Sequence, residues 1–282
     1  MKQSTLKKIL GISDKEFMRI LDLFKESDEK VGGHLMDAPG VLFDISLYSF
    51  YPILFFSIFH IDADYDDIIL HSRYYSGWVF ILDKIYDETS NYLNKNDFLV
   101  LSTSLSAADY YLHKIMRHRP LQEYQNLDLF RRANDTNLRR EVLFFKYGIK
   151  YSDKEIDQYC IDKYALAKAV VHICFVCANK KDKKIYNKII LSHDYFAIAR
   201  QFLDEIEDYE QDYSMGKFNV YANELIVTYG KLIKEVQIKR KMLSRAYECL
   251  QKAIRCVDGI PESGWKRFLI INLCTMEKKL SD

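Results

Sequence analysis

Apolar side chains recur every three or four residues along most of the chain, and alternating strand-like patterns are nearly absent. This periodicity predicts helices over residues 98–116, 138–147, 156–178, 185–213, 224–257 and 262–279. Two Ser-x-x-Glu sequences, at residues 13–16 and 152–155, have the form of capping boxes that open helices. We therefore expect an all-α fold: one domain over residues 1–282, built as a single bundle of about ten helices.

The composition agrees with a large helical core. Only 10 glycines and 4 prolines occur in 282 residues, no stretch resembles a linker, and hydrophobic residues make up 49%. A formal charge of +1 gives no reason to expect nucleic acid as a partner. The first residues lack the long apolar stretch of a signal peptide, and the most apolar segment, 41–61, contains polar residues and a proline. We expect a cytoplasmic protein with no membrane span.

The densest group of acidic residues lies in the segment AIARQFLDEIEDYEQDYSMGK, at 197–217, which has six acids between positions 204 and 212. Asp204, Asp208 and Asp212 are four residues apart and share one helix face, which Gln201 extends by a turn. Like charges at this spacing destabilise a helix, unless water or a divalent cation offsets the repulsion. Magnesium often bridges a few carboxylates to substrate phosphates. The spacing alone leaves both a solvated acidic face and a metal site open.

A second acidic pair lies upstream in GWVFILDKIYDET, where Asp83 and Asp87 are again four residues apart. The residues around them are strongly apolar, and a carboxylate is costly to bury without a partner. Helices of a bundle that face each other with inward carboxylates are a known way to build a metal site. The two acidic segments together favour a metal-binding cleft.

These segments resemble motifs of the class I isoprenoid synthases, which comprise the trans-isoprenyl diphosphate synthases and the class I terpene synthases. QFLDEIEDYEQDYSMGK is similar to the second aspartate motif, F-Q-x-x-D-D-x-x-D followed by G-K, with Glu205 at its second aspartate and matches at Gln201, Asp204, Asp208, Gly216 and Lys217. LDKIYDE resembles the first motif, D-D-x-x-D, with Lys84 between Asp83 and Asp87.

Further resemblances follow in the family's order along the chain. AADYYLHK, at 107–114, is similar to the G-D-Y-L-L helix, with Asp109 at its aspartate. EIDQYCIDKYALAKA resembles the segment with the K-T pair, which places Lys163 at the diphosphate-binding lysine. The last residues resemble the family's final two helices. The resemblance also favours a homodimer.

The resemblance implies that Mg²⁺, two or three ions, links carboxylates to an allylic prenyl diphosphate and neutralises the charge on the leaving group. The metal ligands that it implies are Asp83, Asp87, Asp204, Glu205, Asp208 and Asp212, and the catalytic residues among them are Asp83, Asp87, Asp204 and Asp208. The implied substrate contacts are Lys163, Gln201 and Lys217, with Phe80 and Tyr110 as aromatic faces near the motifs that could stabilise an allylic cation.

Two departures from the family affect the expected reaction. The segments that would bind the diphosphate of isopentenyl diphosphate read GGHLMDAPG and ETSNYLNK, and neither contains an arginine. A second diphosphate would therefore lack guanidinium contacts. We expect a terpene synthase-like reaction on one substrate, in which ionisation is followed by cyclisation or elimination. The alternatives are prenyl transfer to isopentenyl diphosphate and a non-catalytic partner subunit of such a synthase.

Overall fold

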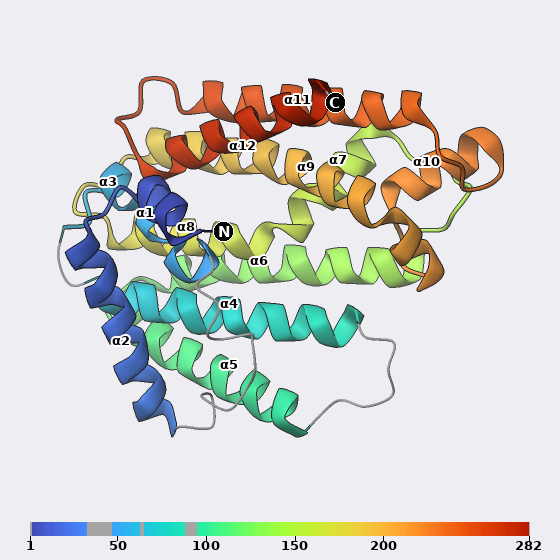
Figure 1. Cartoon of the computed structure of the whole chain (residues 1–282). Coiled ribbons are helices and arrows are strands. Elements are labelled where there is room, and N and C mark those ends of the chain that lie inside the picture. Colours follow the sequence, from blue (N-terminus) through green and yellow to red (C-terminus); the bar gives the residue numbers. More distant parts are fainter. Residues whose placement is uncertain (1, 33–46, 63–64, 88–94, 282) are drawn as a thin grey trace. The chain divides into compact units, whose positions relative to one another are not determined.

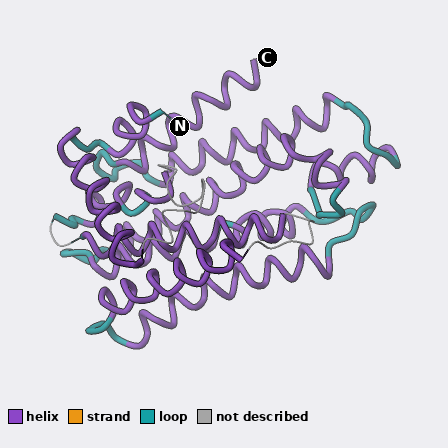
Figure 2. The backbone as a smooth tube through the Cα atoms, turned by 60° about the horizontal axis from the view of Figure 1, so that its bottom comes forward, coloured by secondary structure: helices purple, strands orange, loops and turns teal. Residues whose placement is uncertain are grey.

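The computed structural model describes residues 2–32, 47–62, 65–87 and 95–281, without the side chains of 83–87, 95–97 and Ser281. Every regular element in these residues is helical, which confirms the all-α class (Figure 2). Among the described residues, no helix combines the length and the apolar character that crossing a bilayer requires.

Contacts divide the chain into two compact units, and the division falls inside three of the helices, α6, α8 and α12. Unit 1 comprises residues 1–123, 173–181 and 261–267, and unit 2 comprises 124–172, 182–260 and 268–282. These units are defined by contacts alone, and the expectation of one domain over residues 1–282 stays a prediction.

Unit 1 holds the first helices of the chain (Figure 1): α1 (Gln3–Leu10), α2 (Asp14–Gly32), the 3₁₀ turn η2 (Leu47–Phe50), α3 (Ile53–Phe59), α4 (Asp66–Asp87) and α5 (Lys95–Met116). Helices α4 and α5 pack side by side. Buried aromatic rings fill the space between α2, η2 and α3, and the Phe17 and Phe50 rings stack at 5.3 Å. Phe55 packs against Trp265 at 5.4 Å, which brings the start of α12 into this core.

Unit 2 holds all or most of the remaining helices: α6 (Leu121–Arg139), the π-helical turn η3 (Arg140–Phe144), α7 (Asp153–Lys163), α8 (Ala165–Cys177), α9 (Lys183–Ser214), α10 (Val220–Tyr229), α11 (Val236–Cys256) and α12 (Gly264–Ser281). The long helices α9 and α11 lie against each other (Figure 1). Small and aliphatic residues of α11, such as Ala246, Leu250 and Ala253, are buried on the packed face.

Three predicted helices differ from the observed ones. The helix expected over 156–178 is interrupted at Tyr164, and the one expected over 224–257 ends at Tyr229 and restarts at Val236. Gly230 adopts a φ of 71° and donates its N–H to the Ile226 carbonyl, the usual end of a helix at glycine. The helix expected over 138–147 is instead the end of α6, which continues into η3. The apolar period runs through both interruptions, so the pattern could not reveal them.

A buried ion pair joins α2 to α4 inside unit 1. Arg73 donates to Asp28 at 2.5 Å, with side-chain exposures of 6% and 1%, and the Tyr74 hydroxyl donates to the same carboxylate at 3.0 Å. The Arg73 guanidinium also lies 4.4 Å from the centre of the Phe24 ring. Removing one partner of such a pair leaves the other charge buried without compensation.

We therefore expect Asp28→Ala to lower the free energy of unfolding by about 3–5 kcal/mol, measured by urea denaturation. The matched control is Asp128→Ala, which removes an exposed pair with Arg132 on α6 and should cost less than about 1 kcal/mol. Equal losses in the two variants would contradict the structural role of the buried pair.

Candidate diphosphate and metal site

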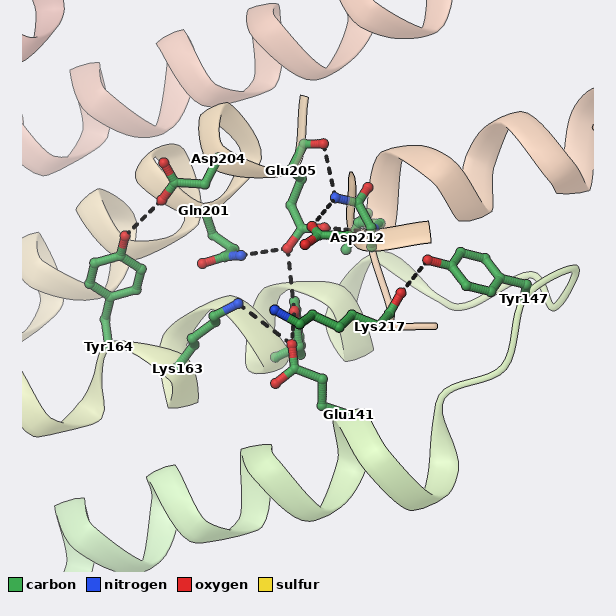
Figure 3. A network of polar contacts seen from close by, with 12 residues as sticks. Glu141, Tyr147, Lys163, Tyr164, Gln201, Asp204, Glu205, Asp212 and Lys217 are labelled. Atoms are coloured by element: carbon green, nitrogen blue, oxygen red, sulfur yellow. Dashed lines mark hydrogen bonds and ion pairs between the residues drawn. The ribbon is translucent and has the colours of Figure 1, made fainter. Parts of the chain in front are cut away.

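The acidic face predicted from the sequence lies on the second half of α9, in unit 2 (Figure 3). Asp182 caps this 32-residue helix by accepting from the N–H groups of Lys184 and Ile185. Apolar residues such as Phe202 and Ile206 are buried in the core of the unit and hold the acidic segment in place. The packing of α9 therefore fixes the positions from which its carboxylates project.

Asp204 is a half-buried carboxylate with two partners. The Tyr164 hydroxyl donates to it at 3.2 Å, and Arg200, one turn earlier on α9, pairs with it at 2.8 Å. Burial raises the pKa of Asp204 above its ordinary value, and the Arg200 charge opposes that shift. Tyr164 is the residue at which α7 and α8 separate, so the helix break supplies the hydroxyl.

Glu205 is fully buried, and both of its oxygens accept hydrogen bonds from the protein. One oxygen accepts from the Gln201 amide and from the Tyr159 hydroxyl, and the other accepts from the Val220 N–H at 2.6 Å. Burial raises its pKa to about 7, and the positive charge of Lys163 opposes the shift. Glu205 thus joins α7, α9 and the first turn of α10. Its role as a metal ligand stays a prediction.

The other two carboxylates of the predicted face differ from each other. Asp208 is exposed. Asp212 accepts from the Asn219 side chain at 2.8 Å, and its backbone carbonyl accepts from the Lys217 N–H at 2.9 Å. Asp212 therefore closes the turn between α9 and α10. Its role as a ligand also stays a prediction.

The two lysines of the predicted site lie in the same network. Lys163 is the last residue of α7, and its amine is 3.5 Å from Glu141 of η3 and 5.7 Å from the centre of the Tyr159 ring. The backbone carbonyl of Lys217 accepts from the Tyr147 hydroxyl. In Figure 3 both amino groups point toward the carboxylates of Glu141 and Glu205. The network thus places two cations beside the acidic face of α9.

Sequence reasoning missed several members of this network: Glu141, Tyr147, Tyr159, Tyr164 and Asn219. Tyr159 carried a usable signal, because it precedes Lys163 by four residues and therefore shares its helix face. Glu141 belongs to a π-helical turn, which no periodic pattern predicts.

The remaining predicted residues belong to unit 1. Asp83 and Asp87 lie in the last turns of α4, and their side chains, with that of Lys84, lie outside the described residues. The Phe80 ring is half-buried and meets Tyr48 edge-on at 5.2 Å. Tyr110 is 61% exposed on α5, beside Asp109, which is also exposed. Substrate contacts at Phe80 and Tyr110 stay predictions, as do metal contacts at the two aspartates.

The donor set fits a divalent cation that also binds a phosphate. Among the described residues, no group of three or more His, Cys, Asp or Glu side chains is placed to hold a metal ion. Asp204 and Asp208 lie one helical turn apart and offer oxygen donors, and magnesium commonly takes one or two carboxylates and completes its coordination with phosphate oxygens and water. The α9 residues that could hold it are therefore Asp204 and Asp208.

Neither a protein-family model nor a curated protein sequence matches the chain. Solved structures do match. The polyprenyl synthase from Caulobacter crescentus CB15, complexed with calcium and isoprenyl diphosphate, has a TM-score of 0.69 at 12% identity over 98% of both chains. Heptaprenyl diphosphate synthase from Staphylococcus aureus has a TM-score of 0.58 at 12% identity over 93% of this chain and 98% of its own.

Geranylgeranyl pyrophosphate synthetase from the archaeon Geoglobus acetivorans has a TM-score of 0.53 at 14% identity, over 99% of this chain and 96% of its own. At these identities the likeness shows the fold. The expected resemblance to the class I isoprenoid synthases is confirmed at that level, and these structural neighbours are prenyl diphosphate synthases.

The raised pKa of Glu205 predicts a pH-dependent stability. The folded chain holds the proton of the Glu205 carboxyl more tightly than the unfolded chain does. The free energy of unfolding therefore falls as the pH rises from about 4.5 through about 7. In metal-free buffer, the free energy of unfolding of Glu205→Gln minus that of the unmodified chain should rise across this interval, by about 3 kcal/mol at most, because the amide does not titrate. Urea denaturation at several pH values would measure it. Glu207→Gln, exposed on the same helical turn, should show no such gain, and a flat difference for Glu205→Gln would refute the prediction.

Proposed function

We propose that this chain ionises an allylic prenyl diphosphate with the help of a divalent cation, Mg²⁺, and transfers the prenyl group to isopentenyl diphosphate. The observation that carries the proposal is the network on α9, in which the half-buried Asp204 lies beside Arg200 of α9 and Lys163 of α7. The likeness to three prenyl diphosphate synthases supports transfer over cyclisation. The expected homodimer belongs to the same proposal.

The two lysines would bind the diphosphate. Lys163 is held by Glu141 at a helix end, and Lys217 lies within the turn that Asp212 and Asn219 close. Lys163 is thus held at its amine and Lys217 at its backbone, and this lowers the conformational entropy that each loses when a phosphate binds. When bound, the cation would neutralise the charge that develops on the leaving diphosphate.

Asp204 and Asp208 would hold that cation. Burial raises the pKa of Asp204, which means that its charge is poorly hydrated, and a poorly hydrated carboxylate interacts strongly with a nearby cation. Tyr164 orients the carboxylate by donating to it. Arg200 pairs with Asp204, and its guanidinium would share this carboxylate with the cation or turn toward the phosphate.

A second reaction is favoured by a separate observation. The segments 32–40 and 88–95 contain no arginine, although this is where the related synthases bind isopentenyl diphosphate. Cyclisation or elimination needs no second diphosphate, so a terpene synthase-like activity is the second candidate. A non-catalytic partner subunit is the third, because Lys84 occupies the middle of the first aspartate motif.

The decisive measurement is diphosphate release from geranyl, farnesyl and geranylgeranyl diphosphates, each with and without isopentenyl diphosphate. We expect release that requires Mg²⁺, stops on adding EDTA and yields longer prenyl diphosphates only when isopentenyl diphosphate is present. Release without it, accompanied by volatile hydrocarbons or alcohols, would favour the second candidate. No release under any condition would contradict both enzymatic proposals.

Asp204→Asn and Asp208→Ala should each lower turnover by at least about a hundredfold, because each removes a cation ligand that acts in the transition state. Circular dichroism should show an unchanged helical content. Glu210→Gln is the matched control, since Glu210 is exposed on the same helix outside the predicted face. Full activity in the Asp208→Ala variant would show that the site is assigned wrongly.

A further inference from the structure

One end of unit 2 exposes apolar side chains from several segments. In the π-helical turn η3, Val142, Leu143 and Phe144 are 66%, 60% and 67% exposed. Four more exposed apolar residues follow in the next loop, at the end of α10 and at the start of α11: Ile149, Val227, Tyr229 and Val236. Exposed apolar residues scattered singly are ordinary, but a group of this size on one end of a unit indicates an interaction surface.

Hydrogen bonds hold these segments together around α10. The Asn223 side chain accepts from the Gly148 N–H and donates to the Ile149 carbonyl, both at 2.9 Å. On the other flank, the Tyr221 hydroxyl donates to the Glu235 carbonyl at 2.9 Å. Figure 1 shows the end of α6, helix α10 and the start of α11 at the same end of unit 2. We call this surface, formed by residues 142–152 and 226–241, the end face.

The end face is also strongly basic. It contains seven basic residues and one acid, in a chain whose formal charge is only +1; the basic residues are Lys146, Lys150, Lys231, Lys234, Lys239, Arg240 and Lys241. All seven are exposed. Among the residues that the structure describes, none of the seven forms an ion pair. The single acid, Glu235, accepts from the N–H groups of Gln237 and Ile238 and so caps α11.

We propose that the end face docks the protein onto the surface of a bilayer that contains anionic lipids. Exposed aliphatic and aromatic side chains can enter the boundary between head groups and acyl chains, while lysines beside them contact anionic head groups. Long lysine side chains reach the head groups even where their apolar stems lie against the lipid. The proposed contact is peripheral, made by side chains at one end of unit 2.

The end face is connected to the polar network of α9. The Phe145 and Phe218 rings stack at 4.5 Å, and the Tyr147 hydroxyl donates to the Lys217 carbonyl. Docking would thus place the Lys163–Asp204 network close to the lipid surface. The proposal concerns binding to lipid and stands whether or not the proposed chemistry is correct.

The test is co-sedimentation of the full chain, in EDTA, with phosphatidylcholine vesicles that contain or lack phosphatidylglycerol. We expect binding that requires phosphatidylglycerol and weakens with added salt. Lys231→Glu combined with Lys234→Glu should weaken binding about tenfold or more, and Leu143→Ser combined with Phe144→Ser should weaken it at unchanged salt sensitivity.

The matched control is Lys184→Glu combined with Lys188→Glu. These two lysines are exposed at the start of α9, roughly 40 Å along the helix from its end. This control should bind as the unmodified chain does, and all variants should keep its melting temperature. Binding that ignores phosphatidylglycerol, or that the control loses equally, would overturn the proposal. The absence of vesicle binding would also overturn it. The same holds if the end-face variants bind no vesicles and change only the self-association measured by sedimentation velocity.

Discussion

The polar site of unit 2 is organised by one buried carboxylate, that of Glu205. A charge taken out of water requires donors that replace its hydration, and here they are the Gln201 amide, the Tyr159 hydroxyl and the Val220 N–H. These donors belong to α9, α7 and α10, so satisfying one side chain fixes where three helices lie. The Val220 N–H is one of the groups that a helix leaves without a partner in its first turn, and a carboxylate also suits the positive end of the α10 dipole.

The parts of the fold that depend on local chemistry could be predicted from the sequence. The capping box at Ser152 and Glu155 forms with both of its reciprocal hydrogen bonds, and the all-α class follows from the apolar period. The breaks at Tyr164 and after Tyr229 could not be predicted, because the apolar period continues through each of them. Gly230 adopts a left-handed φ and ends α10, but a glycine can also take a right-handed φ and lie inside a helix, so the residue type alone does not decide where a helix ends.

The same distinction applies within the site. The sequence indicated that the acidic segment of α9 was unusual, but it gave no means of separating Glu205 from Asp208, one buried and the other exposed. Their difference arises from the rotation of about 100° per residue along a helix and from the segments that cover one side of α9. Burial, which raises the pKa of Glu205 to about 7, is a property of the assembled unit. Identities of 12–14% with proteins of the same fold agree with this, because a helical core tolerates many sequences that keep its pattern.

The π-helical turn η3 has a consequence for communication across unit 2. Within this turn Glu141 contacts Lys163 and Tyr159, whereas Val142, Leu143 and Phe144 face solvent. A ligand that shifts this turn from outside would move the backbone that carries the Glu141 carboxylate, which holds the Lys163 amine. Thermodynamic linkage is reciprocal, so occupancy of the inner site would change the affinity of the outer surface by the same factor.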